Sequence, residues 1–255
     1  MAGKEKDDFD IKKFVPDEDQ RRIYAKVFDR QTIMAVHSLA TKGYFDVLEF
    51  VISTGKEGHV FRARDVAGNY RAVKIYKIEA SEFKQMSKYL EGDIRFQRIK
   101  KGKRDLIYAW TKKEFRNLIE MNKAKIRVPL PIAFKTNVLV MEFVGENGEA
   151  SPRLKDKYAQ DAEKVHSAFV DFMAKMHFRA RLVHADLSEY NILNKNEELV
   201  VIDCGQAVPT THPNAKEFFE RDIRNLSNYL NKIGIKTDEE SLTEEIRAKK
   251  EEFKK

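Results

Sequence analysis

The sequence lacks the features that define several large classes of protein. It contains a single cysteine, Cys204, in 255 residues, which excludes an internal disulfide and a zinc site built from several cysteines. No apolar run approaches the roughly 18 residues that a membrane-spanning helix needs, and no signal peptide is visible at the N-terminus. We therefore expect a cytoplasmic protein with no membrane partner.

Charge is abundant and mostly positive. Charged residues make up 35% of the sequence and the formal net charge is +7, a balance that favours polyanionic partners such as nucleotides or RNA. Hydrophobic residues make up 42%, enough for a chain of this length to bury a substantial core.

Two short stretches carry the most information about chemistry. Residues 182–191 read Leu-Val-His-Ala-Asp-Leu-Ser-Glu-Tyr-Asn, and residues 199–205 read Leu-Val-Val-Ile-Asp-Cys-Gly. Asp186, Asn191 and Asp203 follow the order in which kinases present a base, a first metal ligand and a second metal ligand. Each motif alone is more typical of an ordinary turn. The three in this order predict a phosphoryl-transfer site.

The residue types suit that chemistry. A phosphoryl group in transfer carries negative charge on its equatorial oxygens, so a divalent cation must lie against them, and Mg²⁺ or Mn²⁺ prefers oxygen ligands. We predict that Asn191 and Asp203 bind this cation. Asp186 would orient the attacking hydroxyl or water and accept its proton. His184 is expected to hold the loop through a hydrogen bond rather than to react.

The upstream half is expected to bind the nucleotide. Residues 47–55 and 59–66 are predicted strands, joined by a small turn whose backbone N–H groups can contact phosphate oxygens. The turn residues assigned to ATP binding are Ser53, Gly55, Lys56 and Gly58.

A third predicted strand, residues 70–76, carries Lys74 within Ala-Val-Lys-Ile, the context of the lysine that pairs with the α- and β-phosphates in kinases. Its carboxylate partner should lie on the following helix. Glu114 is the best candidate and Glu120 is the rival, while ordinary pairing of either with nearby lysines is the structural alternative.

Two familiar phosphate-binding loops are excluded. Gly55-Lys56 is followed by Glu57 and Gly58 and then by a strand-like run, whereas a Walker loop needs Ser or Thr and a helix at that point. The Gly-x-Gly-x-x-Gly loop of ordinary protein kinases is also missing.

A set of motifs spread over most of the chain resembles the RIO-type atypical protein serine kinases, in the type-one branch whose phosphate loop reads Ser-Thr-Gly-Lys-Glu, and we expect an archaeal member. The chain departs from this pattern at Gly58, His59, Ala185 and Cys204, none of which removes a charged catalytic group. The matching segments are 53–57, 73–76, 113–118, 139–143, 183–184, 186–191, 202–203 and 205–206.

The resemblance implies a bilobal α+β fold like that of protein kinases, and it implies ATP and Mg²⁺ or Mn²⁺ as cofactors. It places Met141 at the gate of the nucleotide site, with the backbone of Glu142 and Val144 facing adenine. It also implies that Asp203 can itself be phosphorylated transiently.

The predicted organisation has four parts, which are an N-terminal helical extension (1–46), a small lobe (47–141), a hinge (142–145) and a large catalytic lobe (146–255). The large lobe is expected to be trimmed, because no Ala-Pro-Glu motif follows Asp203 and the activation segment and peptide-docking helices are therefore missing. Further helices are predicted at 21–41, 165–177 and 214–234.

Residues 80–106 are rich in lysine and arginine and are predicted to form a flexible basic loop. Such a segment is either a solvated insertion or a contact for RNA or the ribosome. Autophosphorylation would fall here, on Ser81 or Ser87.

Two functions remain open from the sequence. One is an autophosphorylating serine/threonine protein kinase that acts in maturation of the small ribosomal subunit. The other is an ATPase switch that binds the subunit precursor or its RNA and is released by hydrolysis. An inactive nucleotide-binding scaffold is disfavoured, since Lys74, Asp186, Asn191 and Asp203 are all present. The protein phosphoacceptor is unknown in either case.

Overall fold

The computed structural model describes residues 28–78, 83–96 and 102–253. Predictions that concern residues 1–27, 79–82 and 97–101, including Ser81 as a phosphorylation site, lie outside these residues. The helices are α2 (Arg30–Thr41), α3 (Phe83–Leu90), α4 (Lys103–Lys123), α5 (Ala162–Ala174), α6 (Ala215–Lys232) and α7 (Glu239–Ala248). The strands are β1 (Val47–Thr54), β2 (Gly58–Arg64), β3 (Tyr70–Tyr76), β4 (Pro131–Lys135), β5 (Val138–Glu142), β6 (Gly145–Glu146), β7 (Glu149–Ala150), β8 (Leu182–Val183), β9 (Ile192–Lys195), β10 (Glu198–Val201) and β11 (Val208–Pro209).

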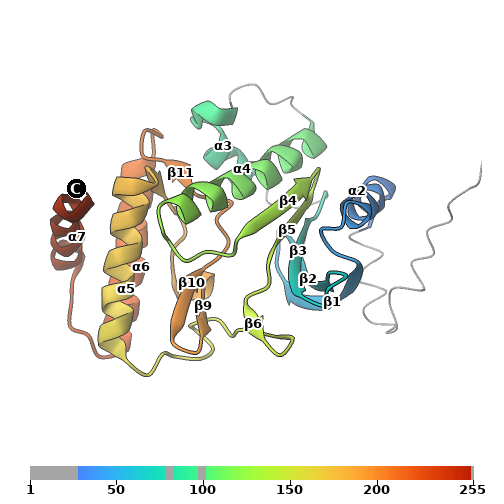
Figure 1. The fold of residues 1–255 in the computed structure, drawn as a ribbon. Coiled ribbons are helices and arrows are strands. Elements are labelled where there is room, and N and C mark those ends of the chain that lie inside the picture. The colour runs from blue at the N-terminus through green and yellow to red at the C-terminus, as the bar shows by residue number, and fades with distance from the viewer. Residues whose placement is uncertain (1–27, 79–82, 97–101, 254–255) are drawn as a thin grey trace, which may run out of the picture.

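A five-stranded antiparallel sheet, in the order β1-β2-β3-β5-β4, forms one half of the molecule (Figure 1). Side chains of a strand alternate between its two faces. On β5, Val138 and Val140 pack in the cluster that contains α2, whereas Leu139 and Met141 pack in the cluster that contains α4. The sheet is thus covered by α2 on one face and α4 on the other. The strands predicted at 47–55, 59–66 and 70–76 agree with β1, β2 and β3 to within two residues at each end.

Helix α2 starts later than the sequence pattern suggested. A continuous helix over 21–41 is wrong, because Phe28 and Asp29 are not helical and the helix begins at Arg30. Asp29 is its N-cap and accepts a hydrogen bond from the Thr32 N–H at 2.8 Å. Such a cap satisfies an N–H that has no partner within the helix, and it defines the helix start.

The prediction of a flexible loop over 80–106 is also wrong for the residues that are described. This stretch contains α3 and the first turn of α4. The apolar side chains of Met86 and Leu90 are buried against Phe96 and Trp110, and the many charged residues of the stretch obscured this amphipathic pattern. Ser87, the second predicted phosphorylation site, is half-buried on α3.

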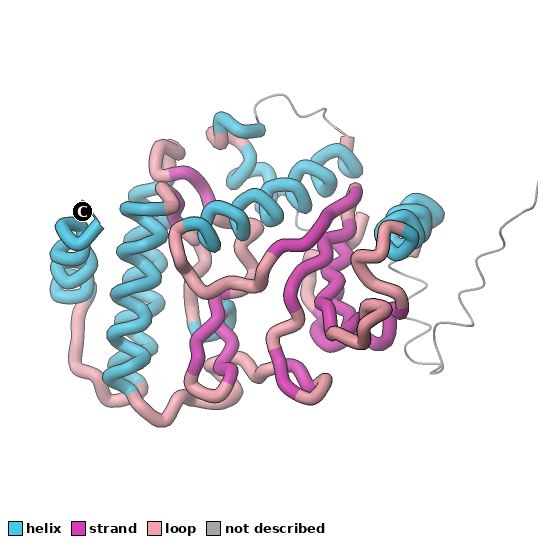
Figure 2. Tube along the Cα trace, viewed as in Figure 1, coloured by secondary structure: helices cyan, strands magenta, loops and turns pink. Residues whose placement is uncertain are grey.

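The second half of the molecule is mostly helical (Figure 2). Helices α5, α6 and α7 pack together beside two short pairs of antiparallel strands, β9 with β10 and β8 with β11. The predicted helices at 165–177 and 214–234 correspond to α5, which continues as a π-helical turn at Lys175–Arg179, and to α6. After Asp203 the chain passes through β11 directly into α6, with no activation segment between them.

The bilobal, kinase-like α+β class is therefore confirmed, while the lobe boundaries stay predictions. Within the described part of the chain, no helix is both long enough and apolar enough to cross a lipid bilayer.

Candidate active site

A cleft of about 490 Å³ lies between the sheet and the helical half. Its walls come from the β1–β2 turn, β3, α4, the end of β5 and the β9–β10 hairpin, and Asp203 lies at its floor. Asp186 is not among the lining residues, and it is joined to the cleft through Asn191. The predicted site residues that line the cleft are Ser53, Gly55, Lys56, Gly58, Lys74, Glu114, Met141, Glu142, Val144, Asn191 and Asp203.

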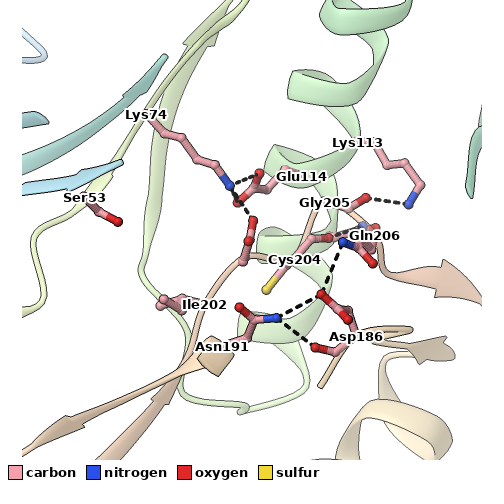
Figure 3. A network of polar contacts seen from close by, with 12 residues as sticks. Ser53, Lys74, Lys113, Glu114, Asp186, Asn191, Ile202, Cys204, Gly205 and Gln206 are labelled. Carbon is pink, nitrogen blue, oxygen red and sulfur yellow. Dashed lines mark hydrogen bonds and ion pairs between the residues drawn. The ribbon is translucent and has the colours of Figure 1, made fainter. Parts of the chain in front are cut away.

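Lys74 lies between two carboxylates (Figure 3). It occupies the same face of β3 as Ala72, the face that packs toward α4. Its Nζ atom lies 2.9 Å from Glu114 Oε1, 2.8 Å from Glu114 Oε2 and 2.6 Å from Asp203 Oδ1. The rival Glu120 instead forms an ion pair of 2.9 Å with Lys123 at the surface. Geometry therefore selects Glu114 as the partner of Lys74.

Electrostatics keep this arrangement charged. Burial alone would lower the pKa of Lys74, but the carboxylates of Asp203 and Glu114 outweigh it and raise that pKa above its ordinary value. The Lys74 ammonium in turn lowers the pKa of Asp203. Opposite charges at this distance each favour the ionised form of the other.

Asp186 and Asn191 form a second group at the edge of the cleft. The Asn191 Nδ2 atom donates to the Asp186 carbonyl at 2.8 Å and to Asp186 Oδ2 at 3.2 Å, and Gln206 Nε2 lies 3.3 Å from the same carboxylate oxygen. The amide oxygen of Asn191 therefore points away from Asp186 (Figure 3). Burial, and then the charge of Asp203, raise the pKa of Asp186, which suits a group that accepts a proton.

Helix α6 holds the loop that carries Asp186. Asp222 is fully buried and accepts the Ala185 and Leu187 N–H groups, each at 2.8 Å. Arg221 donates to the carbonyl of Ala185, a residue with a left-handed φ of 69°. Sequence reasoning missed Asp222. The sequence feature that could have indicated it is an acidic residue next to the apolar residues of a predicted helix.

His184 is fully buried, and its Nε2 atom lies 3.3 Å from the carbonyl oxygen of Ile202. Burial lowers the pKa of His184 to about 4, so the ring is neutral near pH 7. In this state it links the loop before Asp186 to the strand that ends before Asp203.

The backbone at Asp203 is unusual. Its φ of 60° lies in the left-handed region, which non-glycine residues rarely adopt and which concentrates at functional sites. The following turn is close against α4, since a Cβ added to Gly205 would lie 2.8 Å from Trp110 Nε1. Only a glycine therefore fits at position 205.

Glu57 is a cleft residue to which sequence reasoning gave no role. It lines the cleft together with Lys74, Glu114 and Asp203. Burial and then the Asp203 charge raise the pKa of Glu57 to about 7, although Lys74 opposes this. The signal was its place in the Ser-Thr-Gly-Lys-Glu turn.

The end of β5 leaves one backbone donor at the cleft. The Glu142 N–H donates to the Leu130 carbonyl at 2.8 Å, and the Val144 carbonyl accepts from the Ser151 N–H at 3.0 Å. The Val144 N–H, in contrast, has no acceptor among the described residues and lies at the cleft. The Glu142 carboxylate is engaged by Arg127 at 2.7 and 2.8 Å, so it is not free to contact a ligand.

The oxygens of Asn191 and Asp203 fit a hard divalent cation. Both residues line the cleft, and the Asp203 side chain is 41% exposed. No group of three His, Cys, Asp or Glu side chains in the described ranges could hold a metal by itself. Phosphate oxygens and water would therefore complete the coordination, as is usual for Mg²⁺ beside a nucleotide.

Comparisons with known proteins agree with this geometry. A family model described as the RIO domain matches residues 59–242. The chain is 43% identical to the RIO-type serine/threonine-protein kinase Rio1 of Haloferax volcanii, over 96% of this chain and 84% of the relative. It is 40% identical to Rio1 of Methanocaldococcus jannaschii, over 88% and 77%. The chain belongs to the RIO family. It is a RIO kinase of the Rio1 type, as the motifs predicted.

Solved structures resemble this RIO kinase in fold. The Rio2 kinase–ADP/Mg²⁺–phosphoaspartate complex of Chaetomium thermophilum superposes with a TM-score of 0.65 at 21% identity. The match covers 85% of this chain and 65% of that one, so the chain spans just under two thirds of the Rio2 kinase. Use of ATP with a divalent metal follows from membership of the kinase family.

Proposed function

We propose that this RIO kinase transfers the γ-phosphoryl group of ATP to a serine or threonine hydroxyl of a protein, its own chain included. One observation carries the proposal, which is that Lys74, Glu114 and Asp203 meet in the same cleft that Asn191 joins to Asp186. Positioning and electrostatic stabilisation supply most of the catalysis in phosphoryl transfer, and these five side chains provide both.

Each residue has a separate role in the proposal. Lys74, oriented by Glu114, binds the α- and β-phosphates. Asn191 and Asp203 would hold Mg²⁺ or Mn²⁺, which neutralises charge on the phosphates when bound. Asp186 orients the acceptor hydroxyl and takes its proton, and its raised pKa and fixed Oδ2 support this role. Val144 offers its N–H to the adenine ring.

Transfer to Asp203 is the second proposed route. A carboxylate oxygen of Asp203 would attack the γ-phosphorus, the bond to the β-phosphate oxygen would break, and ADP would leave. Water would then hydrolyse the acyl phosphate and restore the carboxylate, which makes the cycle an ATPase. The phosphoaspartate of the Rio2 complex motivates this route, and the partly exposed Asp203 side chain is accessible to a γ-phosphate.

Asp186→Asn is the decisive variant. With labelled ATP and Mg²⁺ or Mn²⁺, it should lose phosphate transfer by roughly 10²- to 10⁴-fold, the range for loss of a general base. Glu120→Gln, at the surface of α4, is the control and should behave as wild type. Equal rates for Asp186→Asn and wild type would exclude the assigned base. A hydroxylamine-labile label that disappears in Asp203→Asn would support the aspartyl phosphate.

For the biological setting we propose maturation of the small ribosomal subunit, either as a kinase or as an ATPase switch on the precursor or its RNA. The net charge of +7 and the resemblance of the chain to this branch support a polyanionic partner. The switch version requires that ATP changes the affinity. Binding of small subunits should therefore be measured with and without ATP at several salt concentrations, since an affinity independent of nucleotide contradicts the switch.

A further inference from the structure

Lys113 is a buried lysine that the proposed mechanism leaves without a role. It precedes Glu114 on α4 and is fully buried. Its Nζ atom donates to the carbonyl oxygen of Gly205 at 2.7 Å (Figure 3) and to that of Ala207 at 2.5 Å. No ion pair among the described residues involves Lys113. Burial lowers the pKa of Lys113 well below its ordinary value, and burying a polar head group without an ion-pair partner is costly, so packing alone is a poor reason for a lysine here.

The same face of α4 makes two more contacts with the segment that follows Asp203. One turn after Lys113, Asn117 Nδ2 donates to the carbonyls of Cys204 and Ala207, both at 2.8 Å. One turn before it, the Trp110 ring lies so close to Gly205 that no Cβ would fit. Residues three and four positions apart lie on one helix face, so three successive turns of α4 hold residues 204–207.

These contacts of α4 with residues 204–207 connect the two carboxylates that contact Lys74. Glu114 belongs to α4 itself, and Asp203 directly precedes this segment. The left-handed backbone of Asp203 comes directly before the carbonyls that Lys113 and Asn117 fix. The position of Asp203 relative to Glu114 therefore depends on these side-chain contacts.

We propose that Lys113 is a positioning residue for the metal-binding carboxylate Asp203. By fixing residues 204–207 against α4, Lys113 makes Glu114 and Asp203 parts of one rigid unit, so that the Lys74 site is assembled before ATP arrives and needs no separate movement of α4. The inference rests on the proposed function, because it takes Asp203 as a metal ligand.

The test is the metal dependence of nucleotide binding, read with fluorescent ADP while Mg²⁺ is titrated. Lys113→Met, which keeps length and removes the donors, should raise the Mg²⁺ concentration for half-maximal effect by roughly 10- to 100-fold, the usual cost of losing a group that orients a metal ligand. Affinity for ADP without metal should change little. Lys112→Met, on the exposed face of the same turn, is the matched control and should match wild type.

A second variant covers the case in which Lys113→Met does not fold. Asn117→Leu removes the other donor and should shift the Mg²⁺ response in the same direction by a smaller factor. Lys113→Gln retains one donor and should recover part of the response. A wild-type Mg²⁺ response in folded Lys113→Met or in folded Asn117→Leu overturns the proposal. The proposal is also overturned if neither of these two variants folds, because the contact would then be structural only.

Failure of the proposed function would look different. The wild-type protein would then bind ADP with the same metal dependence and yet neither transfer nor release phosphate from ATP. The binding assay reports on Lys113 independently of that result.

Discussion

The phosphate-contacting turn and the two acidic loops border the same cleft but are held in different ways. At the turn between β1 and β2, Thr54, Gly55 and Lys56 are exposed, and Gly55 N–H bonds only to Gly58 at 2.9 Å within the turn. The loops that carry Asp186 and Asp203 are instead anchored from beneath by fully buried polar side chains of α6 and α4.

The difference separates two tasks. The acidic loops set the positions of a base and a metal ligand, and an error of about 1 Å there costs a large factor in rate. The turn covers phosphates whose position changes during a catalytic cycle, and it is held by exposed contacts such as the hydrogen bond from Lys77 Nζ to the Gly55 carbonyl at 2.9 Å. Segments with few buried contacts open most easily, and we expect the turn to be the more mobile side of the cleft.

Loss of Asp222, which holds the loop that carries Asp186, should have the largest effect on activity and stability. Asp222→Ala leaves two buried N–H groups, those of Ala185 and Leu187, without an acceptor, at a cost of about 1–3 kcal/mol each. We expect a large loss of stability in urea unfolding and at least a 100-fold loss of phosphate transfer. Glu220→Ala, at the exposed side of the same helix, is the control. Transfer at the wild-type rate in folded Asp222→Ala would show that the anchor is dispensable.

The next largest effect is expected on the free energy of unfolding, at one of the two glycines of the turn. A Cβ at Gly58 would lie 2.4 Å from the Ile75 carbonyl oxygen, whereas a Cβ at Gly55 would lie at an ordinary 3.4 Å from the Gly58 carbonyl. Gly58→Ala should therefore lower the unfolding free energy by about 1–3 kcal/mol, and Gly55→Ala should cost far less. Thermal and urea unfolding of the two variants would decide it, and equal losses would refute the contrast.

The pH dependence of stability should reveal His184. Its pKa is about 4 in the folded chain and about 6.5 when unfolded. Between these values the unfolded state binds more protons, so the unfolding free energy should fall as pH drops from about 6.5 toward 4, by at most about 3 kcal/mol. His184→Asn should flatten this part of the curve relative to wild type. An unchanged slope would mean that the ring is not the group responsible.

The smallest effect is expected at the tip of the turn. Lys56→Ala removes an exposed side chain and should change the unfolding free energy by no more than about 0.5 kcal/mol. Its effect on the KM for ATP should be a few-fold and should weaken with added salt, since exposed charges are screened. A loss of transfer as large as that of Asp222→Ala would contradict the comparison between turn and loops.

Patterns that depend on neighbours in sequence were predictable. The strands, the order of Asp186, Asn191 and Asp203, and the trimmed region after Asp203 all follow from local motifs. Helix phase favours Glu114 over Glu120, because Glu114 lies four positions after the buried Trp110. Helix α3 was missed because polar and charged residues separate Met86 and Leu90, the two apolar side chains that it buries.

Contacts between a side chain and a distant carbonyl were not predictable. Lys113, Asn117 and Asp222 bond to backbone groups more than 30 residues away, and every residue offers such groups, so the partner leaves no mark in the sequence. Burial of these three polar side chains became visible only in the structure.

The 2.6 Å contact between Lys74 and Asp203 has a thermodynamic consequence. Without ligands, Lys74 and Asp203 neutralise each other. A triphosphate that binds Lys74 would release Asp203 to bind the cation, and a cation that binds Asp203 would release Lys74 to bind the phosphates. Nucleotide and metal should therefore bind cooperatively, each raising the affinity for the other by the same factor.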